Sequence, residues 1–169
     1  GMSDCVTAQT APASPQQAGF GLTGRLTIRD VDGNVLHEGE NKICQTGMGV
    51  ILAAFQSPSA LNTFKYIGFG TNSTAATSAQ ASLLAECSGG SYARLIATQK
   101  EGANARVYRM SGTWTNNVGS QQVIREWGVF NASTGGVMLA RYATTGTGVC
   151  TVQTSGVLYT QYDITVAAG

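Results

Sequence analysis

The chain has 169 residues, a length that suits one domain with a sizeable hydrophobic core. Only 11% of its residues are charged and the formal net charge is +1, whereas about 25% charged residues is ordinary for soluble domains. The few basic residues are scattered, so the sequence lacks the basic patch that binds nucleic acid or an anionic membrane. We therefore expect neither partner, and a surface built mainly from Thr, Ser, Asn, Gln and Gly.

The first 18 residues show no hydrophobic periodicity and contain two prolines. Their few apolar side chains cannot offset the entropy lost on ordering the backbone. We predict that residues 1–18 form a flexible arm, which either stays free or orders against a neighbouring subunit. Residues 19–169 should form the single folded domain. Gly1, before Met2, resembles a remnant of tag removal.

A β-hairpin is predicted directly after this arm. Leu26 and Ile28 alternate with polar residues over 24–30, and the sequence Val-Asp-Gly-Asn then leads into a second alternating segment over 35–43. This combination of alternation and turn residues is typical of two antiparallel strands.

The turn of this hairpin also has the first spacings of a calcium-binding EF-hand loop, with Asp30, Asp32 and Asn34 in ligand positions. The sixth position of such a loop would be Val35 instead of Gly, and the twelfth would be Asn41 instead of Glu. We therefore predict turn chemistry here and no calcium site.

The hydrophobic period changes from strand to helix over residues 45–58. Thr46 is suited to cap the start of a helix, and Pro58 is suited to end it. We expect one apolar stripe at helical spacing to pack this helix on a sheet: Met48, Ile51, Leu52 and Phe55.

The next stretch, 67–87, begins with two glycines that resemble part of a phosphate-binding loop. A dinucleotide fingerprint needs a third glycine three residues after Gly70, but Thr71, Asn72 and Ser73 follow it. The chain also lacks the Gly-Lys-Ser/Thr of a P-loop. We predict a strand that ends in a polar loop, and a second short helix over 78–86.

From residue 91 onward the pattern is almost entirely that of strands. Alternating segments over 91–100, 105–115, 121–130, 136–145 and 155–166 are separated by short runs of turn residues. Seven or eight strands in this arrangement indicate an all-β fold, an antiparallel, jelly-roll-like β-sandwich with one or two short helices.

Residues suited to catalysis or metal binding are few. Cys5, Cys44, Cys87 and Cys150 are never closely spaced, so we expect buried free thiols. His37 is the single histidine, and every Ser-His-Asp triad, Cys-His dyad or HExxH zinc site would need it. The carboxylate pair of a glycosidase would have to come from Glu126 and Asp163. We expect no enzymatic activity, no cofactor and no metal.

The segment 125–141 is predicted to form a hairpin of central strands that turns at Gly135 and Gly136. Alternation places Glu126 on the face of Ile124 and Phe130, where an unpaired carboxylate would be very costly. Its predicted partner is Arg141 on the next strand. Alternation also places Arg125 beside Trp127 and Val129, so we expect the Arg125 guanidinium to stack on the Trp127 ring. A ligand site built on Glu126 is the alternative.

Three stretches, in their order and spacing, resemble a pattern common in bacteriophage tail-associated and other virion structural proteins. They are an Asn-led helix over 41–55, a strand ending in Gly-Phe-Gly-Thr before a Ser/Thr/Ala run over 65–86, and Arg-Glu-Trp-Gly before a glycine turn and Leu-Ala-Arg over 124–142. The resemblance implies a structural component of a virion, made in the bacterial host cytoplasm. It leaves open whether the protein belongs to the tail, baseplate or head.

The expected partners are other virion proteins and further copies of the chain. A sandwich leaves edge strands, which three lysines and three prolines protect poorly, so we expect a homo-oligomer, and a trimer or larger ring rather than a dimer. The alternative to an oligomer is a monomer that its polar surface keeps in solution. The alternative is a module that binds a glycan or a cell-surface receptor, because Trp114, Trp127 and six tyrosines could stack on sugar rings. Trp114 shares a strand face with Tyr108 and Met110, which favours a place in the core.

Overall fold

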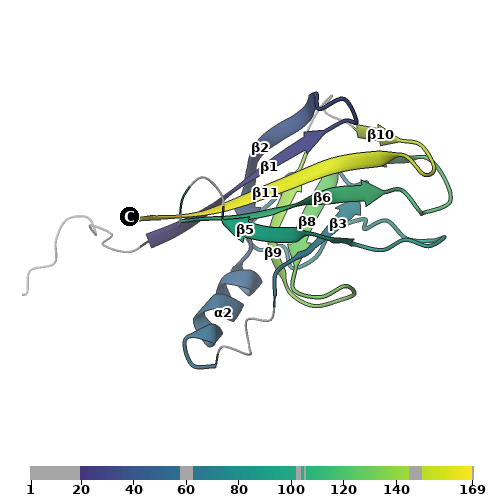
Figure 1. The fold of residues 1–169 in the computed structure, drawn as a ribbon. Coiled ribbons are helices and arrows are strands. Elements are labelled where there is room, and N and C mark those ends of the chain that lie inside the picture. Colours follow the sequence, from purple (N-terminus) through teal and green to yellow (C-terminus); the bar gives the residue numbers. More distant parts are fainter. Residues whose placement is uncertain (1–19, 58–62, 102–103, 105, 145–149, 169) are drawn as a thin grey trace, which may run out of the picture.

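The structure is a computed structural model that describes residues 20–57, 63–101, 104, 106–144 and 150–168. The described chain forms antiparallel strands and one short helix, so the predicted all-β class is confirmed (Figure 1). The predicted arm over 1–18 lies outside the described residues.

Nine strands form one large sheet in the order β4-β3-β8-β9-β2-β1-β11-β6-β5, and β7 and β10 form a separate pair. Every pairing between these strands is antiparallel. The strands are β1 (Phe20–Arg29), β2 (Val35–Ile43), β3 (Tyr66–Gly70), β4 (Leu95–Ile96), β5 (Thr98–Glu101), β6 (Val107–Thr115), β7 (Gln122–Ile124), β8 (Glu126–Phe130), β9 (Met138–Ala143), β10 (Cys150–Val152) and β11 (Val157–Ala168).

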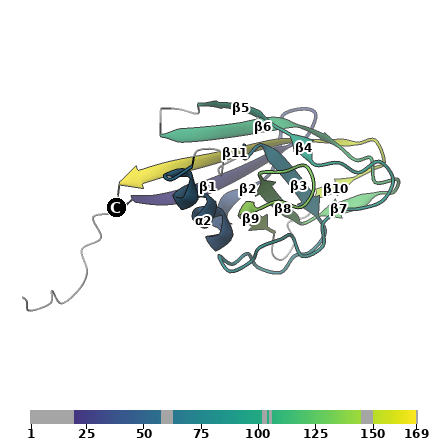
Figure 2. The ribbon, with the colours of Figure 1, turned by 90° about the horizontal axis from the view of Figure 1, so that it is seen from below.

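The large sheet curls until its two edges nearly meet. Its edge strands, β4 and β5, are separated along the chain by Ala97 alone. One extended segment therefore pairs first with β3 and then with β6. At the opposite side β2 pairs with β1 and, through Lys42 and Ile43, with β9. Figure 2 shows the resulting layers, with β5, β6 and β11 in one and β3, β8 and β9 in the other.

The main hydrophobic core lies between these two layers. β1 contributes Leu26 and Ile28, β11 contributes Tyr162 and Ile164, and β8 contributes Trp127 and Val129, all of them buried. A smaller cluster contains Cys44, Leu83, Phe130 and Met138. Alternation explains both clusters, because successive residues of β8 point to opposite faces of the sheet. Strand β8 is thus buried on both faces.

The first hairpin follows the prediction. Strands β1 and β2 pair, and the Asp30 carboxylate accepts hydrogen bonds from the backbone N–H groups of Asp32 and Asn34, both at 2.9 Å. Gly33 has a φ of +84°, which favours glycine. The Asp30 carboxylate therefore stabilises a turn.

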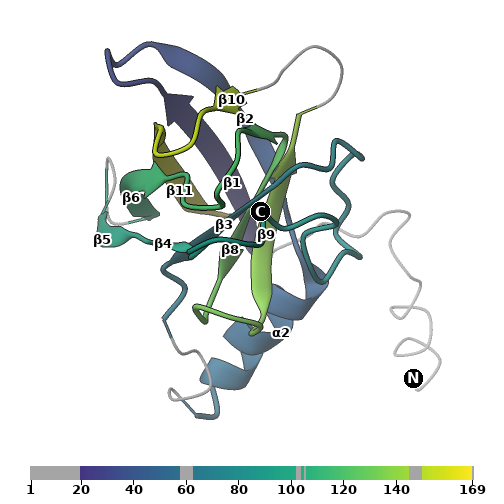
Figure 3. The same cartoon turned by 90° about the vertical axis from the view of Figure 1, so that its right-hand side faces the viewer.

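The helix α2 (Gln45–Ala54) exists, but of the predicted packing stripe only Ile51 packs, partly buried, against the main core. Met48, Leu52 and Phe55 have exposed fractions of 40%, 63% and 75%. The helix instead turns Gly47 toward β9, where a Cβ would lie 2.5 Å from the Leu139 Cα. Close backbone contact places one side of α2 on the sheet, where Ile51 is partly buried, and leaves the three other predicted side chains outside. Figure 3 shows α2 extending from the end of the β-structure.

The predicted start of α2 also needs correction. The N-cap residue is Cys44, and no side chain caps the helix there. The Thr46 hydroxyl donates instead to the Met138 carbonyl, at 3.2 Å. Tertiary contact with β9 thus decides the role of this threonine.

The predicted second helix over 78–86 is absent, because these described residues form turns and bends. The backbone N–H groups of Leu84 and Ala85 donate to the Glu126 carboxylate instead of to helical carbonyls. The predicted strand over 121–130 is interrupted at Arg125, where the chain passes from the small sheet to the large one. Ile124 accordingly lies in the main core with Trp127, and not on the face of Glu126.

The two glycines of α2 provide a matched test of its packing. Gly47→Ala should destabilise the protein by about 1–3 kcal/mol, because the added methyl group meets the β9 backbone. Gly49→Ala should stabilise it by about 0.5–1 kcal/mol, because its Cβ would meet nothing within 4 Å and alanine favours the helix. Urea denaturation of both variants measures the change in the free energy of unfolding. Equal changes for the two variants would contradict the close contact between Gly47 and β9.

The described cysteines are buried free thiols, as predicted. Burial raises the pKa of the Cys44 and Cys87 thiols to about 11 and that of Cys150 to about 12. Since the thiolate is the reactive form, we expect these residues to react with iodoacetamide at pH 8 far more slowly than free cysteine does. Peptide mass spectrometry with and without denaturant checks this, and rapid labelling of the folded protein would contradict it.

Candidate functional site

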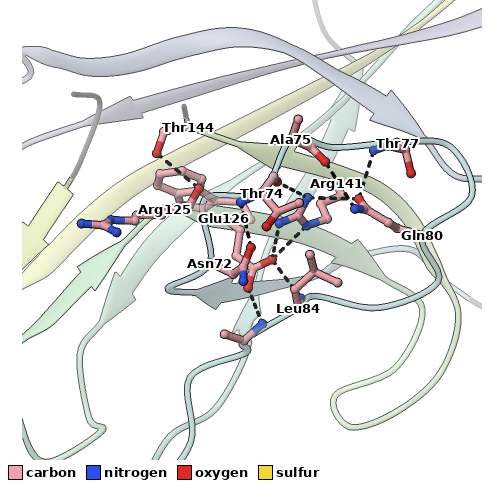
Figure 4. A network of polar contacts seen from close by, with 12 residues as sticks. Asn72, Thr74, Ala75, Thr77, Gln80, Leu84, Arg125, Glu126, Arg141 and Thr144 are labelled. Atoms are coloured by element: carbon pink, nitrogen blue, oxygen red, sulfur yellow. Dashed lines mark hydrogen bonds and ion pairs between the residues drawn. The ribbon is translucent and has the colours of Figure 1, made fainter. Parts of the chain in front are cut away.

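The predicted pairing of Glu126 with Arg141 is present at the centre of the β8–β9 hairpin (Figure 4). Arg141 Nε donates to Glu126 Oε2 at 2.8 Å, and Nη2 lies 2.8 Å from the same oxygen. Both side chains are completely buried. Strands β8 and β9 pair antiparallel with Gly128 opposite Arg141, which places the two charged residues diagonally across the hairpin.

The remaining polar atoms of this pair bind the polar segment 71–86. Glu126 accepts hydrogen bonds from Leu84 N (3.0 Å) and Ala85 N (2.6 Å). Arg141 Nη1 donates to the Thr74 carbonyl at 2.8 Å and to Gln80 Oε1 at 3.0 Å. A buried ion pair is stable only when such additional hydrogen bonds compensate for lost water. The pair therefore fixes a loop that has little regular structure of its own.

The environment of Glu126 assigns it a structural role. Its carboxylate is fully buried, and Arg141 and two backbone amides bind it, so a ligand site built on this residue does not form. Asp163, the other carboxylate considered for a glycosidase pair, binds Arg109 at 2.7 and 3.0 Å in the other layer. Within the described part of the chain, no group of three His, Cys, Asp or Glu residues could hold a metal ion.

Of the other predicted features of the hairpin, the turn glycines follow the prediction and Arg125 does not. Gly135 and Gly136 have φ values of +61° and +73°, so both adopt the left-handed backbone that suits glycine. The predicted stacking of Arg125 on Trp127 is wrong. The ring neighbours of Trp127 among the described residues are His37 and Tyr142, with centroids at 6.2 and 5.7 Å.

The backbone explains why Arg125 departs from the prediction. Arg125 lies between β7 and β8, where its N–H donates to the Gly70 carbonyl and its carbonyl accepts from Thr144 N. The alternation rule does not apply across this interruption, so the direction of the Arg125 side chain is not linked to that of Trp127.

A second charged cluster was not predicted. Arg94 Nε and Nη2 donate to the two oxygens of Glu86 at 2.8 and 2.9 Å, and Nη1 donates to the carbonyls of Ala132 and Gly135. The guanidinium carbon lies 3.5 Å from the Phe130 ring centroid. Arg94 thus holds the turn between β8 and β9 against the loop 86–94. No periodicity links Glu86 with Arg94, and only the folded loop brings them together.

Tyr92 completes this cluster. Its hydroxyl donates to Glu86 Oε2 at 2.9 Å and accepts from the Phe69 N–H at 3.2 Å. Burial raises the pKa of Tyr92 far above its ordinary value, so its hydroxyl remains a donor at neutral pH.

A groove of about 700 Å³ lies beside the cluster, between the loop 86–94 and the β8–β9 turn. Its lining combines small polar residues, exposed backbone and a few apolar side chains. These residues are Glu86, Cys87, Ser88, Gly89, Gly90, Tyr92, Ala93, Arg94, Ile96, Ser133, Thr134 and Gly135.

Comparisons of the chain with models of protein families, with curated proteins and with solved structures found no match. In the described residues, no helix is long and apolar enough to cross a membrane.

The buried pair can be tested against an exposed pair in the same protein. Glu126→Gln should lower the free energy of unfolding by about 3–5 kcal/mol, because it leaves the Arg141 charge buried without its counter-ion. Glu38→Gln removes the half-exposed partner of Arg25 and should cost less than about 1 kcal/mol. Urea denaturation measures both. Equal costs would show that the buried pair does not hold the hairpin and its loop together.

Proposed function

We propose that the protein is a non-enzymatic structural component of a bacteriophage particle that acts through protein–protein assembly. The resemblance described above supports this proposal. Two of the stretches that carry it, 65–86 and 124–142, lie against each other through the Glu126–Arg141 pair. Their order along the chain therefore corresponds to one packed unit of the fold.

The single observation that favours assembly is the exposed apolar side of α2. Met48, Leu52 and Phe55 lie at positions i, i+4 and i+7, on the side of the helix away from Gly47. The helix contains no charged residue. A cluster of large exposed apolar side chains on one helix face is typical of a protein interface.

The exposed sheet edges contribute less to the driving force for association than the sequence analysis predicted. The edge strands β4 and β5 are consecutive in the chain, and the sheet curls until they lie near each other. The apolar side of α2 is therefore the stronger reason to expect association.

We propose that a second copy of the chain covers this side of α2. Two uncharged helix faces can approach without like-charge repulsion and without removing water from ions. Such contacts between copies can close a ring or form a pair, and other virion proteins then bind the assembled unit.

The oligomeric state tests this proposal directly. The wild-type protein should have a mass of at least twice 17.5 kDa, the mass of one chain, in light scattering after size-exclusion chromatography. Leu52→Lys should reduce the mass to that of one chain, because a lysine at the apolar contact must lose water and meets no counter-charge. Val31→Lys is the matched control, since Val31 is 64% exposed in the β1–β2 turn, at the end of β2 opposite α2.

A wild-type mass of 17.5 kDa, or equal dissociation of both lysine variants, would contradict assembly through α2. The proposed place in a particle has its own test. Mass spectrometry of phage particles purified from the native host should detect the chain at a constant copy number per particle. Its absence from purified particles would overturn the virion role.

A further inference from the structure

Among the described residues, the groove beside Glu86 and Arg94 has one hydrogen-bond acceptor and one donor without a partner, side by side. Glu86 Oε2 accepts two hydrogen bonds, from Arg94 and Tyr92, whereas Oε1 accepts one, from Arg94 Nη2. A carboxylate oxygen can accept two, so Oε1 retains one lone pair. Arg94 Nη2 carries two N–H groups and uses one of them, so it retains one donor.

We propose that this groove binds a neutral saccharide. A sugar hydroxyl both donates and accepts, so adjacent hydroxyls can donate to Glu86 Oε1 and accept from Arg94 Nη2. The hydroxyls of Ser88, Ser133 and Thr134 supply further partners along the groove. The apolar edge formed by the exposed Ile96 offers contact to the C–H face of a sugar ring.

The charge of the groove selects against ionic ligands. Among the described lining residues, Glu86 is the only acidic one and Arg94 the only basic one, and the two bind each other through two hydrogen bonds. The pair carries no net charge, so an anionic or cationic ligand would lose water without gaining a counter-ion. A neutral ligand rich in hydroxyl groups has no such penalty.

The same arrangement favours binding over cleavage of the saccharide. Glycoside hydrolysis by the common mechanisms needs two carboxyl groups on either side of the bond, and the described lining of this groove has one. Three hydrogen bonds also hold the Glu86 carboxylate in place. The groove is thus suited to recognise a glycan and release it unchanged.

The groove is preformed, which lowers the cost of binding. Arg94 joins the loop 86–94 to the carbonyls of Ala132 and Gly135, and its guanidinium lies over the Phe130 ring. Both walls are therefore fixed before a ligand arrives, and less conformational entropy is lost when it binds.

This inference goes beyond the proposed assembly function and does not depend on it. The residues that line the groove include none from α2. Saccharide binding should therefore be the same in the wild-type protein and in the Leu52→Lys variant, whatever their oligomeric states.

The test is a ¹H–¹⁵N NMR titration of the full chain with methyl glycosides of glucose, galactose, mannose and N-acetylglucosamine, at millimolar concentrations. N-acetylneuraminic acid serves as the charged comparison. At least one neutral glycoside should shift the amide signals of Gly89, Gly90 and Gly135 in a saturable way.

Ser88→Trp should raise the dissociation constant of the neutral glycoside by about tenfold or more, because the indole fills the groove. Ser73→Trp, at an exposed residue outside the groove, should leave it unchanged.

Three results would overturn the proposal. The first is that none of the neutral glycosides shifts these amides in the wild-type protein, a measurement that does not depend on any variant folding. The second is that the shifts occur elsewhere, or that Ser73→Trp weakens them as much as Ser88→Trp does. The third is saturable binding of N-acetylneuraminic acid alone, which would show that the groove selects an anion.

Discussion

A buried carboxylate cannot stay charged in a protein interior unless cations and hydrogen-bond donors replace its lost water. At the centre of this fold Glu126 meets that requirement through Arg141 and two backbone amides, and the consequences extend well beyond the pair. The two amides belong to the segment 71–86, which must adopt turns to present them. Gly70 must lack a side chain, because a Cβ there would collide with the Glu126 carboxylate. One ion pair thus constrains a strand end, a hairpin and the loop that covers it.

Arg94 solves a similar problem at the next loop. Its guanidinium is almost completely buried, and five hydrogen-bonding N–H groups must find partners or remain available. Glu86 and two carbonyls of the β8–β9 turn accept four of them. The two arginines therefore fix two irregular segments that hydrophobic burial alone would hold poorly, because such segments are polar and lack the ladder of a strand. A groove with rigid walls results.

The low proportion of charged residues in the chain can be related to the ion pairs that these residues form. Several of its charged residues form ion pairs with one another: Glu126 with Arg141, Glu86 with Arg94, and Asp163 with Arg109. The surfaces that remain are close to neutral, both along the exposed side of α2 and in the groove. Neutral surfaces are suited to contacts that are stabilised by the exclusion of water and by hydrogen bonds. They are less suited to attracting a charged partner electrostatically over a long range. This agrees with the proposed roles in assembly and in binding an uncharged glycan.

The sequence by itself determined the all-β class, the first hairpin and the pairing of Glu126 with Arg141, because alternation and turn residues act locally and a central carboxylate requires a nearby cation. Tertiary structure alone decided the packing side of α2, where contact between Gly47 and β9 outweighs the burial of Leu52 and Phe55. It also decided the loss of a helix over 78–86, since backbone amides there bind a carboxylate that is distant in sequence. The groove could not be predicted either. Its walls come from segments about 40 residues apart in the chain. No local sequence pattern predicts which loops the curled sheet brings together.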